Sequence, residues 1–344
     1  MKIVLAIDSF KNCLTSIQAE NAVQEALRQT GIDAEIVSIP VSDGGEGMLD
    51  AFLAVTGGEK IVVSTHNALM RPIQAYYGAI DDTAIIESAQ SIGLQLVNPC
   101  PRNSFKATTY GVGEILADAI FRGFRKFIVG LGGSATSDAG IGMLWALSAK
   151  FGDKDFKGCS FTLASDVKNP LLGDHGAARV FAPQKGATPS QVKRIEERAA
   201  KFADMSAKRF GADHRNDPGA GAAGGLGYAF LQYFDAKMES GAELLLRLAH
   251  FDNIIKDADL VITGEGCADS QTLMGKLPSI VLSHARQFSV PVYLIAGKIK
   301  EQQQLKDADF EKIECITPDG QTQEEAIKSE NAIKNITDTI QKLF

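Results

Sequence analysis

The sequence predicts an α/β fold in which both ends of the chain build one parallel sheet. Continuous branched apolar runs at residues 3–7 and 260–263 are typical of strands that are buried on both faces. Segments with helical apolar periodicity follow both runs, which gives the alternating strand–helix order of a doubly wound fold. That order is lost after residue 60, so we expect a second domain inserted into the first.

The first domain opens with a helix whose start is clearly marked. Thr15 and Gln18 form a capping box before a stripe of Ala, Val and Leu residues, and Gly31 ends the helix. We expect further strands at 35–39, 292–295 and 313–316, and helices at 48–55, 279–288 and the C-terminal end. Residues 1–60 and 256–344 are assigned to this domain.

The inserted domain, residues 61–255, is expected to hold a different sheet. Short strands at 60–64, 73–77 and 84–87 follow one another with little helix between them, as in a meander. A buried strand is expected at 127–129, and helices at 112–121, from 141 onward, at 190–209 and at 228–234. The mixed charges of 190–209 predict a solvated helix. The glycine-dense tract 218–227 precedes a helix, which favours close packing or anion approach over a flexible linker.

Composition limits the function classes. A chain of 344 residues exceeds the usual size of one core, and 45% hydrophobic and 22% charged residues are ordinary for a globular protein. A net charge of −7 without any Lys/Arg block argues against a nucleic-acid partner. Five scattered cysteines without a C-x-x-C pair indicate a reducing compartment and no zinc site. We find no signal peptide and no membrane-spanning run, so we expect a cytoplasmic protein without a membrane partner.

A glycine loop near the middle of the chain is the first candidate binding site. It follows the strand at 127–129, and its glycine and polar positions are Gly130, Gly132, Gly133, Ser134, Thr136, Ser137 and Asp138. A strand, a glycine loop and a helix N-terminus in this order present backbone N–H groups to an anion, usually a phosphate. A tight connection that binds nothing is the alternative.

Two loops near the N-terminus carry further candidates. The segment DSFK at 8–11 follows a parallel strand, and ligands bind at the carboxyl ends of such strands. A local ion pair is the alternative there. The segment SDGGEG at 42–47 places Asp43 and Glu46 around Gly44 and Gly45, and paired carboxylates can hold Mg²⁺. A solvated acidic turn is the alternative for this second loop.

Later segments repeat the combination of acids, lysines and glycines. Their candidate residues are Asp166, Lys185, Glu265, Asp269, Thr272 and Lys276. Phosphoryl transfer needs this combination, because N–H groups and lysines bind phosphate while carboxylates hold Mg²⁺ or contact the attacking hydroxyl. The sequence contains neither G-x-x-x-x-G-K-[ST] nor the protein-kinase motifs.

Rival interpretations stay open at this point. Gly130, Gly132 and Ala135 fit the dinucleotide fingerprint, with Asp153 or Asp155 at about the expected spacing, which would make an NAD(P)-dependent oxidoreductase. Small-molecule kinases with a GLGSSA loop follow the same phosphate logic, but the proline upstream of that loop is absent here. A non-enzymatic ligand sensor is a third alternative.

Eight segments taken together resemble the class I glycerate kinases of bacteria. They lie, in the order of that family, at residues 8–11, 42–47, 107–114, 130–140, 166–171, 183–187, 219–227 and 264–276. The resemblance implies phosphorylation of D-glycerate by ATP and Mg²⁺, which gives 2-phosphoglycerate. It also implies a Rossmann- or flavodoxin-like parallel-sheet domain with a second α/β domain inserted, and an active site in the interdomain cleft.

The expected roles follow from the resemblance and from the chemistry of the side chains. Catalytic roles are expected for Asp8, Lys11, Asp138 and Asp269, with Asp138 or Asp269 orienting or deprotonating the glycerate hydroxyl. Substrate or phosphate binding is expected at Ser9, Gly44, Gly45, Gly132, Gly133, Ser134, Thr136, Lys185, Glu265, Thr272 and Lys276. Candidate metal ligands are Asp43, Glu46 and Asp166. The chain departs from the family pattern at Asn12, Cys13, Ser137, Ala139, Ser165 and Ile280, but keeps the acids and lysines. A homodimer is allowed.

Overall fold

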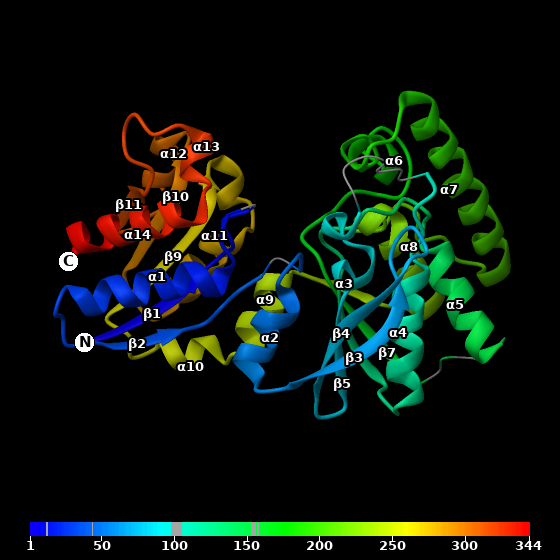
Figure 1. The fold of residues 1–344 in the computed structure, drawn as a ribbon, viewed down its shortest axis with the longest axis horizontal. Coiled ribbons are helices and arrows are strands. Elements are labelled where there is room, and N and C mark those ends of the chain that lie inside the picture. Colours follow the sequence, from blue (N-terminus) through cyan, green and yellow to red (C-terminus); the bar gives the residue numbers. More distant parts are fainter. Residues whose placement is uncertain (12, 43, 98–104, 153–155, 157) are drawn as a thin grey trace. The chain divides into compact units, whose positions relative to one another are not determined.

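The computed structural model describes residues 1–11, 13–42, 44–97, 105–152, 156 and 158–344. The chain divides into two compact units, drawn in Figure 1, and each is described by itself. Unit 1 comprises Met1–Asp43, Asp50–Thr56 and Ala242–Phe344, and unit 2 comprises Gly44–Leu49 and Gly57–Gly241.

Unit 1 is built on a fully parallel sheet in the order β11-β10-β9-β1-β2. The strands are β1 (Lys2–Ile7), β2 (Glu35–Ser38), β9 (Leu260–Ala268), β10 (Val292–Ile299) and β11 (Lys312–Cys315). Ile3 pairs with Leu260, so the first strand of the chain lies beside a strand from its last third. This is the strand order of flavodoxin-like sheets, and it confirms the predicted parallel sheet.

Helices pack against this sheet as the apolar stripes predict. α1 (Ser16–Gln29) begins at the expected capping box, in which Thr15 and Gln18 exchange hydrogen bonds between side chain and backbone. α1 and α14 (Ser329–Leu343) lie side by side in Figure 1 and share an apolar core with β1 and β9. The other helices of this part of the chain are α2 (Met48–Thr56), α9 (Gly241–Leu248), α10 (Phe251–Ile255), η3 (Ser270–Leu273), α11 (Leu277–Gln287), α12 (Gln302–Lys306) and α13 (Gln323–Ala326).

Unit 2 contains a mixed sheet in the order β3-β4-β5-β6-β7-β8. Its strands are β3 (Glu59–His66), β4 (Pro72–Ile80), β5 (Thr83–Glu87), β6 (Lys126–Gly130), β7 (Ser160–Ala164) and β8 (Lys237–Glu239). β3, β4 and β5 pair antiparallel, as the predicted meander requires, whereas β5 to β8 pair parallel. The helices are α3 (Ala89–Ile92), η1 (Leu94–Leu96), α4 (Tyr110–Phe121), α5 (Ile141–Phe151), α6 (Ala177–Phe181), η2 (Pro183–Lys185), α7 (Pro189–Phe210) and α8 (Ala222–Phe234). Within the described ranges of the whole chain, no helix is long and apolar enough to span a membrane.

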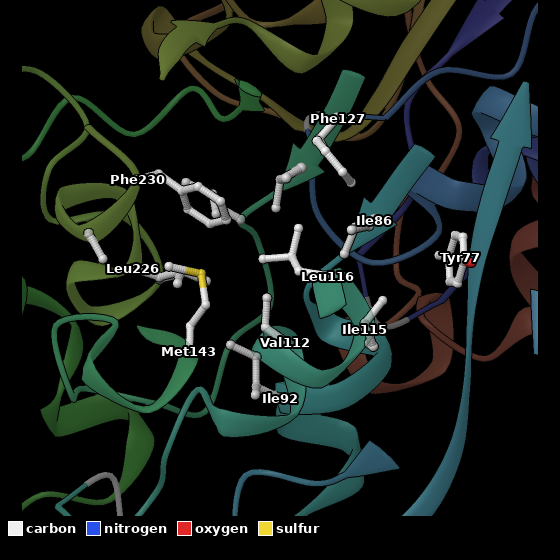
Figure 2. Close-up of a cluster of buried hydrophobic side chains, with 14 of the residues drawn as sticks. Tyr77, Ile86, Ile92, Val112, Ile115, Leu116, Phe127, Met143, Leu226 and Phe230 are labelled. Carbon is white, nitrogen blue, oxygen red and sulfur yellow. The ribbon is translucent and has the colours of Figure 1, made fainter. Parts of the chain in front are cut away.

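The core of unit 2 holds the glycine loop in place by packing the elements on both sides of it. Figure 2 shows Ile86 and Phe127 of the sheet, Leu116 of α4, Met143 of α5 and Phe230 of α8 in one cluster. These side chains are almost completely buried. Burial of such side chains contributes roughly 1.5–3 kcal/mol each. The packing therefore fixes β6 and α5, and with them both ends of the loop that connects them.

Three of the differences between the structure and the predicted elements concern the second sheet and the candidate site. β7 and β8 extend the second sheet beyond the expected strands. They were not predicted, because such short segments carry little periodic signal. β9 continues to Ala268, so Glu265 lies on a strand rather than in the expected loop. α8 is not regular at its start, since residues 223–225 have left-handed backbone angles.

The units also divide at other places than the expected 60/61 and 255/256. The second sheet already begins at Glu59, before the expected boundary. The chain returns to unit 1 at Ala242. α9 and α10 both contact α11 through His284, whose imidazole lies 2.6 Å from Asp252 of α10 and 3.3 Å from Glu243 of α9.

Candidate active site

The glycine loop that follows β6 is held at its start by two other segments of unit 2. The amide of Gly132 donates to the carbonyl of Gly44 at 2.9 Å, and that of Leu131 to the carbonyl of Ala164 at 3.3 Å. A Cβ at Gly132 would lie 2.4 Å from the Cα of Gly45, so only glycine fits this approach. Gly44 and Gly45, which we predicted to bind phosphate, therefore have a packing function as well.

Three carbonyl groups of the loop are bound by protein donors. The pairs are Leu94 N–H with Gly133 at 2.9 Å, Lys185 Nζ with Thr136 at 2.7 Å and Arg198 Nη2 with Ser137 at 2.7 Å. In a trans peptide group the C=O and the following N–H point in opposite directions. The N–H groups of Ser134, Ser137 and Asp138 therefore point away from these three donors.

These amides make the loop a candidate anion site. None of the N–H groups of Ser134, Ser137 and Asp138 donates a hydrogen bond to a residue that the structure describes. All three residues are nevertheless buried. Buried N–H groups without an acceptor are rare because they are costly, and loop amides at a helix N-terminus are suited to anions.

Asp138 lies at the end of the loop, two residues before Gly140, the N-cap of α5. Its Oδ2 accepts hydrogen bonds from the amide of Thr109 at 2.8 Å, the hydroxyl of Thr109 at 3.0 Å and the amide of Gly142 at 3.1 Å. Its Oδ1 accepts from the amide of Gly140 at 3.2 Å. Because both oxygens are engaged and the residue is buried, the geometry favours a role in holding the loop over proton transfer.

Lys185 is a buried cation of this cluster. Its exposed fraction is 4%, and its Nζ donates to the Ser134 hydroxyl at 3.0 Å in addition to the Thr136 carbonyl. Both partners are uncharged, so burial lowers the pKa of Lys185 to about 7, against the opposing effect of the Asp138 charge. A bound anion would hold the proton on this amine.

A second cation reaches the loop from α7. Arg198 donates to the Ser137 carbonyl and, from Nη1, to the Phe105 carbonyl at 3.3 Å. Burial lowers the pKa of Arg198, although the charge of Asp138 opposes this shift. The sequence did not predict a role for Arg198, because the mixed charges of 190–209 give no sign that one arginine turns inward.

The glycine-dense tract packs directly against the loop. Gly224 has a φ of +67°, and a Cβ there would lie 2.1 Å from the carbonyl oxygen of Thr136. The carbonyl of Gly224 accepts a hydrogen bond from the amide of Ala139 at 3.0 Å. Close packing, one of the two expected explanations, therefore accounts for the glycines at this point.

The candidate metal ligands are only partly visible. Asp43 lies outside the described residues. Glu46 and Asp166 are exposed, and they follow Gly45 and the end of β7, the two segments that hold the start of the glycine loop. Among the described residues, no group of three or more His, Cys, Asp or Glu residues is arranged to hold a metal ion.

Unit 1 carries a second polar cluster at the end of β9. Glu265 is buried and accepts hydrogen bonds from the Thr272 hydroxyl at 2.5 Å and from Lys276 Nζ at 3.2 Å. The same Nζ lies 3.9 Å from a carboxylate oxygen of Asp269, which caps η3. The charge of Lys276 is thus held beside a partly exposed carboxylate.

The loop after β1 adjoins this cluster, because β1 and β9 are neighbours. The amide of Asp8 donates to the carbonyl of Gly264 at 2.9 Å, and its Oδ1 accepts from the amide of Ser9 at 2.6 Å. A Cβ at Gly266 would lie 3.6 Å from the amide nitrogen of Lys11. The tertiary structure therefore groups these three predicted residues with the predicted residues after β9.

Comparison with known proteins identifies the family of this chain. A model of the glycerate kinase family matches residues 3–157 and 152–344. The chain is 38% identical over 326 residues to the glycerate kinase of Bacillus subtilis (strain 168), with 87% of this chain and 85% of the relative covered. It is 37% identical over 328 residues to the glycerate 2-kinase of Escherichia coli (strain K12), with 88% and 86% covered. The chain belongs to the glycerate kinase family.

A solved structure extends the likeness to this family. The crystal structure of a chain described as a glycerate kinase 2 from Salmonella typhimurium LT2 has a TM-score of 0.83 and 33% sequence identity, and it covers 100% of this chain and 97% of that chain. The likeness confirms the two-domain α/β fold. The oxidoreductase alternative finds no support, since the family is one of kinases and α5 begins only at Ile141, well after Ala135.

Proposed function

We propose that this chain is a glycerate kinase that transfers the γ-phosphoryl group of ATP to D-glycerate and forms 2-phosphoglycerate and ADP. The observation that supports it best is the glycine loop of unit 2, in which the N–H groups of three buried residues find no acceptor among the described residues, while Lys185 and Arg198 bind two of its carbonyls. The membership in the glycerate kinase family supports the substrate class. The name of the Escherichia coli relative supports the position of phosphorylation.

The glycine loop of unit 2, together with Lys185, is proposed to bind phosphate groups. Phosphoryl transfer requires negative charge on the transferred group to be stabilised in a dry, preorganised site. The N–H groups of Ser134, Ser137 and Asp138 are preorganised by the hydrogen bonds on their carbonyl side. Lys185 adds a positive charge, because a bound anion favours the protonated amine and so opposes the effect of burial on its pKa.

The unit 1 cluster is proposed to act on the glycerate hydroxyl. Asp269 is the better candidate for the general base, because its carboxylate is partly exposed, whereas Asp138 is buried and engaged. Glu265 orients Lys276, which we propose to bind glycerate or a phosphate oxygen. We propose that Asp8, Ser9 and Lys11, in the loop that follows the neighbouring strand β1, belong to the same group.

Magnesium is proposed as the metal cofactor. Glu46 and Asp166 offer exposed carboxylates, the hard oxygen donors that Mg²⁺ prefers, beside the segments that hold the glycine loop. Mg²⁺ keeps several water ligands and binds substrate phosphates, so a small number of protein carboxylates fits this ion. When bound, it would neutralise phosphate charge.

A direct assay tests the proposed function. The purified chain with ATP, Mg²⁺ and D-glycerate should release ADP in a coupled assay, and NMR of the product should identify 2-phosphoglycerate. Formation of 3-phosphoglycerate would contradict the position, and ligand binding without ADP release would favour a sensor. Addition of EDTA should abolish turnover, and added Mg²⁺ should restore it.

Location and assembly are proposed more simply. We propose a cytoplasmic enzyme, because Cys13, Cys159, Cys267 and Cys315 are free thiols in the structure, as a reducing compartment predicts. Cell fractionation would test this. A homodimer is a further proposal, which light scattering on the purified chain would decide.

A further inference from the structure

Arg198 lies on the carbonyl side of the glycine loop, opposite the amides for which the described part of the chain supplies no acceptor. It joins two separate segments of the chain, since it donates to the Ser137 carbonyl at 2.7 Å and to the Phe105 carbonyl at 3.3 Å. The guanidinium carbons of Arg198 and Arg194 lie 5.2 Å and 4.5 Å from the centre of the Phe105 ring. The position of the Arg198 guanidinium is therefore set by contacts in several directions.

The hydrogen bond from Arg198 to the Ser137 carbonyl also affects the N–H group of the same peptide unit. The Ser137 carbonyl and the Asp138 N–H belong to one planar unit, so fixing the carbonyl also fixes the direction of the N–H. A hydrogen bond from an ionised donor is about twice as strong as a neutral one. It also polarises the peptide group, which makes the Asp138 N–H a better donor.

The charges around the loop favour an anion on the amide side. Asp138 is a buried carboxylate, and its charge acts on both Arg198 and Lys185. When Lys185 is protonated, two cations face one carboxylate, which leaves an excess of positive charge behind the amides. In a poorly solvated site such an excess attracts a multiply charged anion.

We propose that Arg198 is a positioning residue for the reaction, which orients the Asp138 amide toward the phosphate groups of the nucleotide through the Ser137 carbonyl. The proposed role needs no contact between Arg198 and the ligand, because it acts through the hydrogen bonds that Nη2 and Nη1 donate to the carbonyls of Ser137 and Phe105. This role rests on the proposed function in one respect, which is that the ligand of the loop is a nucleotide phosphate.

Arg194 provides a matched control for the test. It contacts the same Phe105 ring from the same helix, yet it donates no hydrogen bond to the loop in the part of the chain that the structure describes. Arg198→Met and Arg194→Met are compared with the wild-type chain in ADP affinity by calorimetry, in the KM values for ATP and D-glycerate, and in thermal midpoint. Arg198→Lys and Arg198→Gln are measured in parallel.

The two arginines should differ clearly. Arg198→Met is expected to weaken ADP binding and raise the KM for ATP by about 10-fold or more, as loss of a hydrogen bond from a charged donor predicts. The KM for D-glycerate should stay within about twofold, and Arg194→Met should change all three values by no more than that, as surface substitutions usually do. Arg198→Lys should restore most of the ADP affinity, because it keeps a charged donor.

Three results would overturn the proposal. They are equal ADP affinity in the two methionine variants, a larger effect on D-glycerate than on ATP, and an absence of ADP binding to the wild-type chain. If Arg198→Met does not fold, Arg198→Gln decides, and wild-type ADP affinity in that variant would contradict the role. A wild-type chain that binds ADP but does not phosphorylate D-glycerate would refute the proposed function, while the ADP comparison would still decide the role of Arg198.

Discussion

The ammonium group of Lys185 lies 2.7 Å from the carbonyl oxygen of Thr136, in a site from which water is almost excluded. This contact makes an amine with a lowered pKa part of the glycine loop. The same contact fixes the direction of the Ser137 amide, which follows Thr136 in the chain. The first two predictions rest on this relationship.

Replacement of Lys185 by methionine should weaken nucleotide binding while the fold is kept. Methionine has a similar length and relieves the cost of a buried charge, but it leaves the Thr136 carbonyl without its donor. We expect kcat/KM for ATP to fall by about 10- to 100-fold, the usual effect of losing a charged hydrogen bond. Steady-state kinetics check this, with the exposed Lys193→Met on α7 as the control. Equal kinetics in the two variants would count against a role for Lys185.

The stability of the unliganded chain should increase with pH above neutrality. The pKa of Lys185 is about 7 in the folded chain and has its ordinary value of 10.5 when unfolded. The unfolded state therefore binds more protons between these pH values, and the free energy of unfolding rises across that window by up to about 1.4 kcal/mol per pH unit. Urea unfolding at pH 7, 8 and 9 measures the slope. Lys185→Met should lack this contribution, and an unchanged slope in that variant would contradict the assignment.

Replacement of Asp138 by asparagine changes the size of the side chain very little, but it should disturb the loop strongly. The side-chain NH₂ of asparagine would face N–H and O–H donors of Thr109, Gly140 and Gly142 that now bind a carboxylate. We expect a loss of roughly 2–4 kcal/mol in the free energy of unfolding, since a buried charged acceptor is lost. If Asp138 only holds the loop, the residual activity should keep the wild-type pH profile. A profile that has lost its limb at low pH would instead indicate a general base.

Asp269→Asn should separate chemistry from stability in unit 1. If Asp269 accepts the proton of the glycerate hydroxyl, kcat should fall by about 10²-fold or more. The thermal midpoint should change little, because the carboxylate is partly exposed. The exposed Asp319→Asn is the control. A kcat close to the wild-type value would remove Asp269 from the catalytic residues and leave Asp8 as the next candidate.

Gly224→Ala should be much more damaging than Gly211→Ala. Both glycines have positive φ angles, +67° and +73°, so both substitutions introduce backbone strain of roughly 1–2 kcal/mol. At Gly211 nothing lies within 4 Å of the new Cβ, whereas at Gly224 the Thr136 carbonyl oxygen lies 2.1 Å away. We therefore expect only Gly224→Ala to lower both the thermal midpoint and nucleotide affinity. Similar losses in both variants would show that φ alone matters.

Much of the fold could be predicted because its signals are local. The apolar runs of β1 and β9 indicated buried parallel strands, and the capping box at Thr15 located the start of α1. β8, with three residues, could not be predicted, because its place depends on pairing with β7 and not on its own periodicity. The boundary near Ala242 likewise depends on contacts between segments far apart in the chain, such as that of His284 with Glu243.

The sequence predicted which residues belong to the candidate site better than it predicted how those residues contact one another. Lys185 and Ser134 were both proposed as phosphate-binding residues, but their mutual contact and the burial of the amine appear only in the structure. Arg198 was missed because a charged residue on an amphipathic helix gives no sign of its partner. Gly132 was proposed as a ligand position, and the structure adds its close approach to Gly45.

The sequence by itself determined the α/β class, the parallel sheet shared by both ends of the chain and the family, because these depend on periodicity and on short motifs. Only the tertiary structure decided which donors bind the loop carbonyls, which loop amides find no acceptor in the described ranges and that the amine of Lys185 is buried. The physical reason is that these properties depend on groups far apart in the chain: Lys185 and Arg198 reach the loop from η2 and α7 through the packing of unit 2.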